Sequence, residues 1–324
     1  MKIRYSLLAA ALLVPAYAGT ATPLVEVTEA APAAKRLSGS ITLGYDSNYT
    51  GRGYVVSHSV AEGDSVVYGA VKLNYDLGKP GQWTLGSTVA YQVPTSGHRL
   101  YGGGVKLSQA TPLAPGVVAP AGTRVPIGDK NIENQFSLIT QANYASTTGL
   151  WNISLGHHFT HGGLLGVMAK HYRDQGASVV NEVFIAPEWT PYKWLSVGVK
   201  TSYSFQSITG WWFEPYVTVK APIIGTPEDI KLLGVVTLGM SATADYFADP
   251  YNACGNGSQA FWVKFSTPWF VRDNLIITPS ISFNWLGKGG LDANKRAEAR
   301  PLDNSAIPFR NFGVVAGISA TYTF

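Results

Sequence analysis

The sequence is short of three things that common classes of protein need. Only 14% of its 324 residues are charged, against about 25% in soluble domains, so a fully water-exposed surface is poorly supplied. It has one cysteine, Cys254, which excludes an intramolecular disulfide. Beyond the N-terminus it has no run of about 18–20 consecutive apolar residues, which excludes membrane helices of ordinary length.

Glycine and amphipathic aromatic residues are abundant instead. The chain has 35 Gly, 17 Tyr and 9 Trp, and 46% of its residues are hydrophobic. Its mean hydropathy is nevertheless only +0.06. Few charges, many glycines and many aromatics, without a long apolar run, are typical of a membrane β-barrel.

The first residues predict a targeting segment. Lys2 and Arg4 precede an apolar stretch over 7–14, and Ala16-Tyr17-Ala18 has the form of a cleavage site. We therefore expect a secretory signal peptide over 1–18. Residues 19–38, rich in Ala, Thr and Pro, are expected to form a flexible periplasmic lead-in.

The expected mature chain gives no reason to propose nucleic acid as a partner. Removal of Lys2 and Arg4 takes the 24 basic residues to 22, against 20 acidic residues, which leaves a net charge of about +2.

From Gly39 onward, apolar and polar residues alternate in twelve segments. A period of two is the strand period, with successive side chains on opposite faces. In the segment 82–93, for example, Trp83, Leu85 and Val89 alternate with Thr84 and Thr88. The segments are 40–47, 66–77, 82–93, 135–144, 150–160, 180–189, 193–205, 211–221, 232–247, 260–267, 275–286 and 311–324.

The connections between these segments alternate in length. Those at one end are mostly tight, and those at the other are mostly long, notably 94–132, 160–178 and 287–310. This alternation and the even number of segments predict a closed, up-and-down antiparallel transmembrane β-barrel of about twelve strands over 39–324. A hairpin hidden in 94–132 would change the count by two. Pro187, Pro215 and Pro279 fall inside predicted strands and are interpreted as rim positions or bulges.

Aromatic residues give a second indication of a membrane barrel. They occur near both ends of the predicted strands, where interfacial girdles belong. The set comprises Trp83, Tyr91, Trp151, Phe159, Trp189, Phe205, Trp211, Phe213, Trp285 and Tyr322.

Two short stretches resemble known outer-membrane proteins. The terminal Phe324, with Tyr322 before it, resembles the C-terminal signature of Gram-negative outer-membrane proteins, which implies recognition by the barrel-assembly machinery. The stretch "LGYDSNYTGRGYVVS" resembles the first strand of a family of proteobacterial putative porins, with the pattern S-x-Y-x-x-R-G. Ser47, Tyr49, Arg52 and Gly53 hold those places. The resemblance implies a porin-like barrel in the cell outer membrane, in contact with its lipids.

The faces of the strands that we expect to point inward carry charges of both signs. Such charges are tolerated inside a barrel only if the lumen holds water or if they pair with one another. They therefore indicate either a polar channel or a barrel plugged by ion pairs, and we favour the channel. The predicted pore-lining residues are Asp46, Lys72, Glu182, Glu188, Lys200, Glu214, Lys220 and Lys264.

Histidines raise two further possibilities. His157, His158, His161 and His171 invite assignment of a metal site, but His157 and His158 point to opposite faces of a strand, and His161 lies past its predicted end. His157 is also expected to face lipid near the outer rim, as in barrel lipid hydrolases, but no serine partner accompanies it.

The remaining alternatives lie at the outer rim and in the loops. Asp245 and Asp249 are candidates, by position alone, for acids of a protease-like site. The loops 94–132 and 287–310 either constrict the lumen or bind an external partner, as in an adhesin.

The sequence thus predicts a non-enzymatic, porin-like channel for passive diffusion of small hydrophilic solutes. No cofactor is implied.

Overall fold

The computed structural model describes residues 37–51, 54–56, 65–78, 83–94, 105–106, 111–114, 117–120, 124–125, 134–162, 179–206, 209–226, 229–245, 256–292 and 311–324. The predicted signal peptide and most of the lead-in, as well as Arg52, Gly53, His171, Asp249 and Cys254, lie outside these residues. Strand β1 begins at Leu37, two residues before the predicted start of the barrel at Gly39.

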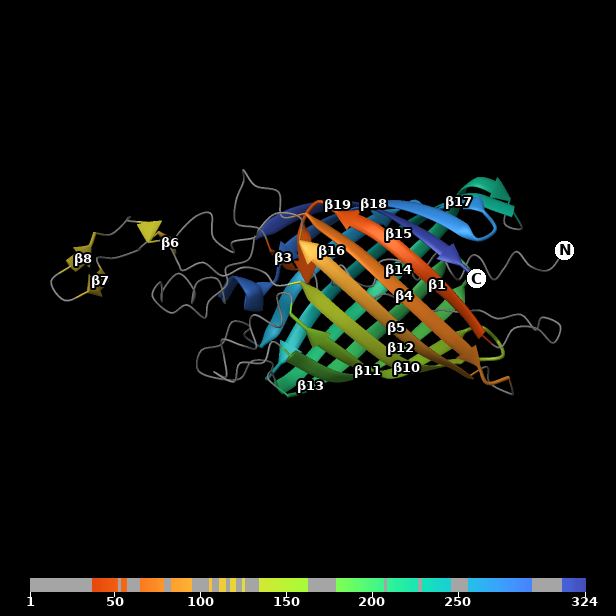
Figure 1. Ribbon diagram of the computed structural model, residues 1–324, viewed down its shortest axis with the longest axis horizontal. Helices are drawn as coiled ribbons and strands as arrows, with labels where there is room; N and C mark the ends of the chain where they lie inside the picture. The colour runs from red at the N-terminus through yellow and green to blue at the C-terminus, as the bar shows by residue number, and fades with distance from the viewer. Residues whose placement is uncertain are drawn as a thin grey trace.

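The described chain forms a closed antiparallel β-barrel (Figure 1). Its strands are β1 (Leu37–Asp46), β4 (Val66–Asp76), β5 (Trp83–Pro94), β10 (Gln135–Ala145), β11 (Trp151–His161), β12 (Val179–Tyr192), β13 (Leu195–Phe205), β14 (Thr209–Thr226), β15 (Asp229–Ala244), β16 (Gly257–Ser266), β17 (Trp269–Arg272), β18 (Leu275–Leu286) and β19 (Phe312–Thr323).

These thirteen segments occupy twelve positions around the ring. Segments β16 and β17 both pair with β15 and β18, in the same register, so together they form one strand interrupted at Thr267-Pro268. Each of the other strands pairs with its neighbours in the chain, and pairing of β1 with β19 closes the ring. The predicted fold class and the count of twelve strands are confirmed, and each predicted segment coincides with a barrel strand.

The long connections lie at one end of the barrel, which we call the loop end, and the tight ones lie at the other, the turn end. At the loop end, described parts of the connections form β2 (Tyr49–Gly51) with β3 (Tyr54–Val56), β6 (Val105–Lys106) with β9 (Arg124–Val125), and β7 (Thr111–Ala114) with β8 (Val117–Ala119). The connection 94–132 therefore does contain short strand pairs, but they lie apart from the barrel sheet, as Figure 1 shows.

Parts of two connections between the predicted segments are strands in the structure. Residues 222–226 and 229–231 extend β14 and β15 past the predicted strand ends at 221 and 232, and 269–272, between the predicted segments 260–267 and 275–286, form β17. Pro222 and the positive φ of Gly225 (104°) coincide with register shifts in the β14–β15 pair. The register of the β14–β15 ladder shifts at these turn-like residues, but the pairing of the two strands continues beyond them.

Pro187 and Pro215 do not mark bulges, and Pro279 lies opposite an interruption of its ladder. The β12–β13 register is the same before and after Pro187, and the β14–β15 register is the same before and after Pro215. Pro279 keeps its register with β19 and lies opposite the break between β16 and β17, where its carbonyl accepts a hydrogen bond from the Thr267 amide (3.0 Å). Each proline is accommodated by a local gap in one ladder, because it has no N–H to donate.

Alternation along each strand separates the side chains into an inner and an outer set. In β4, Val66, Tyr68 and Lys72 are buried inside, whereas Val67, Val71 and Leu73 are exposed outside. Among the described residues, no helix is long and apolar enough to cross a membrane.

Candidate functional site

The barrel interior is the candidate site, because its wall gathers the charged side chains of otherwise separate strands. All eight residues that were predicted to line a pore lie on the inner face, on β1, β4, β12, β13, β14 and β16. They comprise four carboxylates and four lysines. Lys200 and Lys264 are half-buried, and the other six are buried (Asp46, Lys72, Glu182, Glu188, Glu214 and Lys220).

Glu188 is the centre of one group of polar contacts. The Tyr216 hydroxyl donates a hydrogen bond of 2.9 Å to Glu188 Oε2, and Lys220 interacts with the same carboxylate electrostatically. Glu188 lies on β12 and Tyr216 on β14, so the bond passes over the intervening strand β13. It does so at Gly198, which lies opposite both residues in the two ladders.

A second group lies across the closure of the barrel. Asp46 on β1 and Lys264 on β16 interact electrostatically although β19 and β18 lie between their strands. The nearest inner residues on those two strands are small: a Cβ added to Gly317 would lie 2.1 Å from Asp46 Oδ1 and 3.2 Å from Ser280 Oγ. The small residues leave the space in which the Asp46 carboxylate lies.

Lys200 belongs to a third group. Its Nζ lies 4.8 Å from the centroid of the Phe184 ring, within the range of a cation–π interaction. Glu214 stands directly opposite Lys200 in the β13–β14 ladder. Lys200 and Glu214 thus place charges of opposite sign side by side on this part of the wall.

Four inner aromatic rings lie flat over inner glycines, a feature that the sequence reasoning missed. Each glycine stands opposite its aromatic partner in a ladder, in the pairs Gly44–Tyr68, Gly156–Phe184, Gly198–Tyr216 and Gly239–Trp262. A Cβ added to any of these glycines would come within 2.2–2.7 Å of the partner's ring atoms. The glycines thus allow bulky rings to lie against the wall instead of projecting across the lumen.

Side chains fill part of the barrel interior. The inner side chains of Trp212, Trp262 and Ile276 are at most 1% exposed, so neighbouring side chains cover them. Other inner residues, such as Thr88 and Ser280, remain partly exposed to water. A barrel of twelve strands lies between the side-chain-filled barrels of about eight strands and the open porins of 16–18, in keeping with this partial filling.

The start of connection 287–310 lies at the mouth of the barrel. Residues 288–292 form a helical turn, drawn in blue at the loop end in Figure 1. The Gly287 amide donates to the Gln259 carbonyl (2.7 Å), and a Cβ on Gly289 would lie 2.4 Å from Gln259 Nε2. The side chain of Gln259 is fully buried and donates to Thr243 Oγ1 on the inner face of β15 (2.8 Å). The turn therefore covers the inner wall at this side of the mouth.

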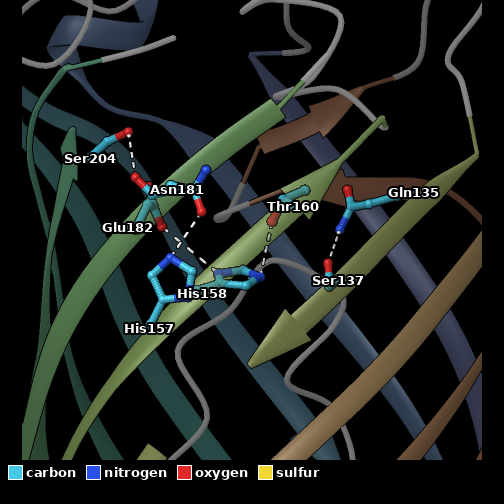
Figure 2. Close-up of polar contacts among 8 residues, drawn as sticks. All are labelled: Gln135, Ser137, His157, His158, Thr160, Asn181, Glu182 and Ser204. Carbon is cyan, nitrogen blue, oxygen red and sulfur yellow. Dashed lines mark hydrogen bonds and ion pairs between the residues drawn. The ribbon is translucent and has the colours of Figure 1, made fainter. Parts of the chain in front are cut away.

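Figure 2 shows the histidines of β11 and their partners. As predicted, the two neighbours point to opposite faces. On the outer face, His157 Nε2 donates to Asn181 Oδ1 (2.9 Å), and the Asn181 amide in turn bonds to Gln206. On the inner face, His158 Nδ1 lies 3.8 Å from Glu182 Oε2, and Nε2 is hydrogen-bonded to Thr160 Oγ1 (3.0 Å).

Two of the sequence predictions concern His161 and Asp245, which lie near the rim. The prediction that His161 lies past the strand end is wrong, because His161 is the last residue of β11. Asp245 has a positive φ of 52° and exchanges hydrogen bonds with Asn256, which joins the two ends of the β15–β16 connection. Among the described residues, no group of three or more His, Cys, Asp or Glu side chains is placed to hold a metal ion.

The outer face is apolar and bordered by aromatic side chains. Leu43, Ile318 and Leu238, for example, are 64%, 51% and 48% exposed. Near the turn end, Trp151 stacks on Trp189 and Trp83 lies against Tyr144, with ring centroids 6.1 and 5.1 Å apart. Near the loop end lie the corresponding ring pairs Tyr203–Trp211, Trp285–Phe312 and Phe136–Phe159.

The chain resembles solved structures of outer-membrane proteins only at low similarity. No protein-family model matches the chain, and no curated protein matches it. Similar solved structures include the KdgM porin (7% identity, TM-score 0.41, 88% of this chain and 99% of that chain) and the NanC porin (11%, 0.43, 88% and 98%). Another is an outer-membrane channel from Pseudomonas putida F1 (9%, 0.48, 91% and 100%). At these identities and TM-scores, the likeness carries neither a fold nor a function from those chains to this one.

Proposed function

We propose that this chain is an outer-membrane barrel that lets small hydrophilic solutes diffuse passively through its lumen. The observation that supports the proposal most strongly is the contrast between its two faces. The outer face is apolar and bordered by aromatic side chains, whereas the inner face carries charged and polar side chains along its whole height. Such a barrel suits lipid outside and water inside. The resemblance of the first strand to a putative porin family points the same way.

Size exclusion is the proposed mechanism. Covered inner residues such as Trp212 and Trp262 leave room only for small solutes, and the helical turn at 288–292 narrows the entrance beside Gln259. Because the eight charged residues divide equally between acids and lysines, we expect weak selectivity between anions and cations.

The first experiment is single-channel conductance of the refolded protein in a planar bilayer with KCl. Discrete conductance steps are expected. Lys200→Glu should shift the reversal potential in a KCl gradient towards cation preference, because it places a second acid opposite Glu214. Lys231→Glu is the matched control, since Lys231 is 59% exposed at the turn end and pairs with Asp229 (3.7 Å).

A folded barrel that stays electrically silent would contradict the channel proposal. The ion pairs would then be a plug, and the loop-end strand pairs β6–β9 and β7–β8 would become the place to look for function, as in a surface adhesin. Figure 1 shows β6, β7 and β8 well away from the barrel wall, which favours that second candidate over the others.

A further inference from the structure

One sector of the inner wall is uncharged. Along β5, β10 and β11, no inner position holds Asp, Glu, Lys or Arg. By contrast, the inner face of β12, β13, β14 and β16 holds six of the eight charged residues described above. The charged side chains are therefore unevenly distributed around the lumen, and β5, β10 and β11 form one stretch of wall without them.

Towards the turn end, this sector and the adjoining strand β4 carry a group of carboxamide side chains, bordered by Lys72 on β4 and by Glu188 on β12, which stands opposite Asn152. The group consists of Asn74 on β4, Gln141 and Asn143 on β10, and Asn152 on β11, and we call it the carboxamide cluster. Asn74 and Gln141 face one another across Gly86, which stands opposite both in the ladders. Asn143 is the next inner residue after Gln141, and Asn152 lies diagonally from it across the β10–β11 pair.

The cluster has buried polar atoms without hydrogen-bond partners. Gln141, Asn74 and Asn152 are only 6%, 7% and 5% exposed. Atoms without a partner are Asn74 Oδ1, both amide atoms of Gln141, Asn143 Oδ1 and Asn152 Nδ2. A buried polar group costs about 1–3 kcal/mol if it is left unpaired, so a concentration of them needs an explanation.

We propose that the carboxamide cluster binds a neutral, polyhydroxylated solute, such as a sugar, during its passage. This inference deepens the proposed function and rests on it. Carboxamides present donors and acceptors side by side and carry no charge. A hydroxyl group both donates and accepts, and therefore matches such a surface. A cation would need oxygen atoms alone, and an anion would need donors alone.

Gly86 lets the two amides approach each other. A Cβ at this position would lie 3.0 Å from Asn74 Oδ1 and 3.4 Å from Gln141 Cγ, so any side chain here would press on both. The inner neighbours of this position on β5, Thr84 and Thr88, are small and uncharged.

The test uses sucrose as the probe and three variants of the full chain. Gln141→Leu removes both amide atoms at nearly constant volume. Gln135→Leu is the matched control, because Gln135 lies on the same strand and face but donates to Ser137 Oγ (3.2 Å; Figure 2). Gly86→Ala keeps every amide and fills the space between Asn74 and Gln141.

Two readouts separate this inference from the channel proposal. Partial block of the KCl current by sucrose reports binding in a conducting lumen, and calorimetric titration of sucrose into the refolded barrel reports binding whether or not it conducts. We expect Gln141→Leu to raise the half-blocking concentration roughly tenfold, as for lost hydrogen bonds worth about 1.4 kcal/mol together. Gly86→Ala should act in the same direction, and Gln135→Leu should leave it within about twofold of the parent.

The outcomes are distinct. Conductance without sucrose binding in the parent protein would overturn the inference and leave the channel standing. A silent barrel that binds sucrose, with the binding lost in Gln141→Leu, would overturn the channel and leave the binding site standing. Equal binding by the parent, Gln141→Leu and Gly86→Ala would show that the cluster holds only water, and would overturn the inference.

Discussion

Gly198→Ala should destabilise the barrel more than a change of one methyl group suggests. Gly198 does not have a positive φ, so its backbone would accept alanine. The side chain of Tyr216 leaves no room for it, because the new Cβ would lie 2.2 Å from the Tyr216 hydroxyl oxygen and 2.3 Å from Cζ. The Tyr216 ring must then move, and its hydrogen bond to Glu188 (2.9 Å) breaks.

The expected loss follows from three contributions. Overpacking of a filled interior costs about 1–3 kcal/mol. A hydrogen bond to a charged group contributes about 1.5–3 kcal/mol. Replacement of glycine by alanine within a strand returns about 0.5–1 kcal/mol. The net expectation is a fall of about 3 kcal/mol in the free energy of unfolding.

The assay is equilibrium unfolding in urea, in lipid vesicles, followed by tryptophan fluorescence. Gly69→Ala is the matched control, since its Cβ would lie at an ordinary 3.4 Å from Leu43 Cδ2 and should be neutral or slightly stabilising. Tyr216→Phe isolates the hydrogen bond and should lose about 2 kcal/mol. If Gly198→Ala lies within about 1 kcal/mol of Gly69→Ala, the argument that glycines make room for inner rings is refuted.

Two further changes test the closure of the barrel. Gly317→Ala places a Cβ 2.1 Å from Asp46 Oδ1, so it should displace the carboxylate from Lys264. We expect the free energy of unfolding to fall by about 1–3 kcal/mol. A free energy of unfolding in urea equal to that of Gly69→Ala would contradict this expectation. Removal of Phe324 should reduce the amount of heat-modifiable barrel in the outer membrane, because Phe324 resembles part of the signature that the barrel-assembly machinery reads. Removal of residues 19–36 is the control and should not reduce it. Equal assembly of the two truncated chains would count against a role of Phe324 in assembly.

The strands and their faces could be predicted from the sequence because both depend on local pattern. A period of two assigns Lys72 or Leu73 to opposite faces without knowledge of any partner strand. The same reasoning failed at 221–231, where Pro222 and Gly225 read as a turn. There the long-range pairing of β14 with β15 supplies hydrogen bonds that outweigh the local preference of these residues.

The arrangement inside the barrel was harder to predict, because it depends on register. Whether Tyr216 reaches Glu188 is decided by which residue of β13 stands between them, and one step of register would exchange Gly198 for Val197 or Val199. A signal was nevertheless present. Counting back from the short connection near Gln206 sets Ser204 opposite Gly210 and hence Gly198 opposite Tyr216. The Asp46–Lys264 interaction offered no such signal, since it crosses two other strands.

The pairing of β1 with β19 also determines the order in which the barrel can fold. Every other barrel pairing joins strands that are neighbours in the order of the barrel strands along the chain, so these ladders close much shorter loops than the seam does. The seam joins Thr42 to Thr321, 279 residues away (3.0 Å). Closure of so long a loop carries the largest entropic cost, so we expect the seam to be the last ladder to form and the slowest. Until it forms, the chain is an open curved sheet with two bare edges, so the rate of seam closure sets how long the molecule is exposed to mispairing with other chains.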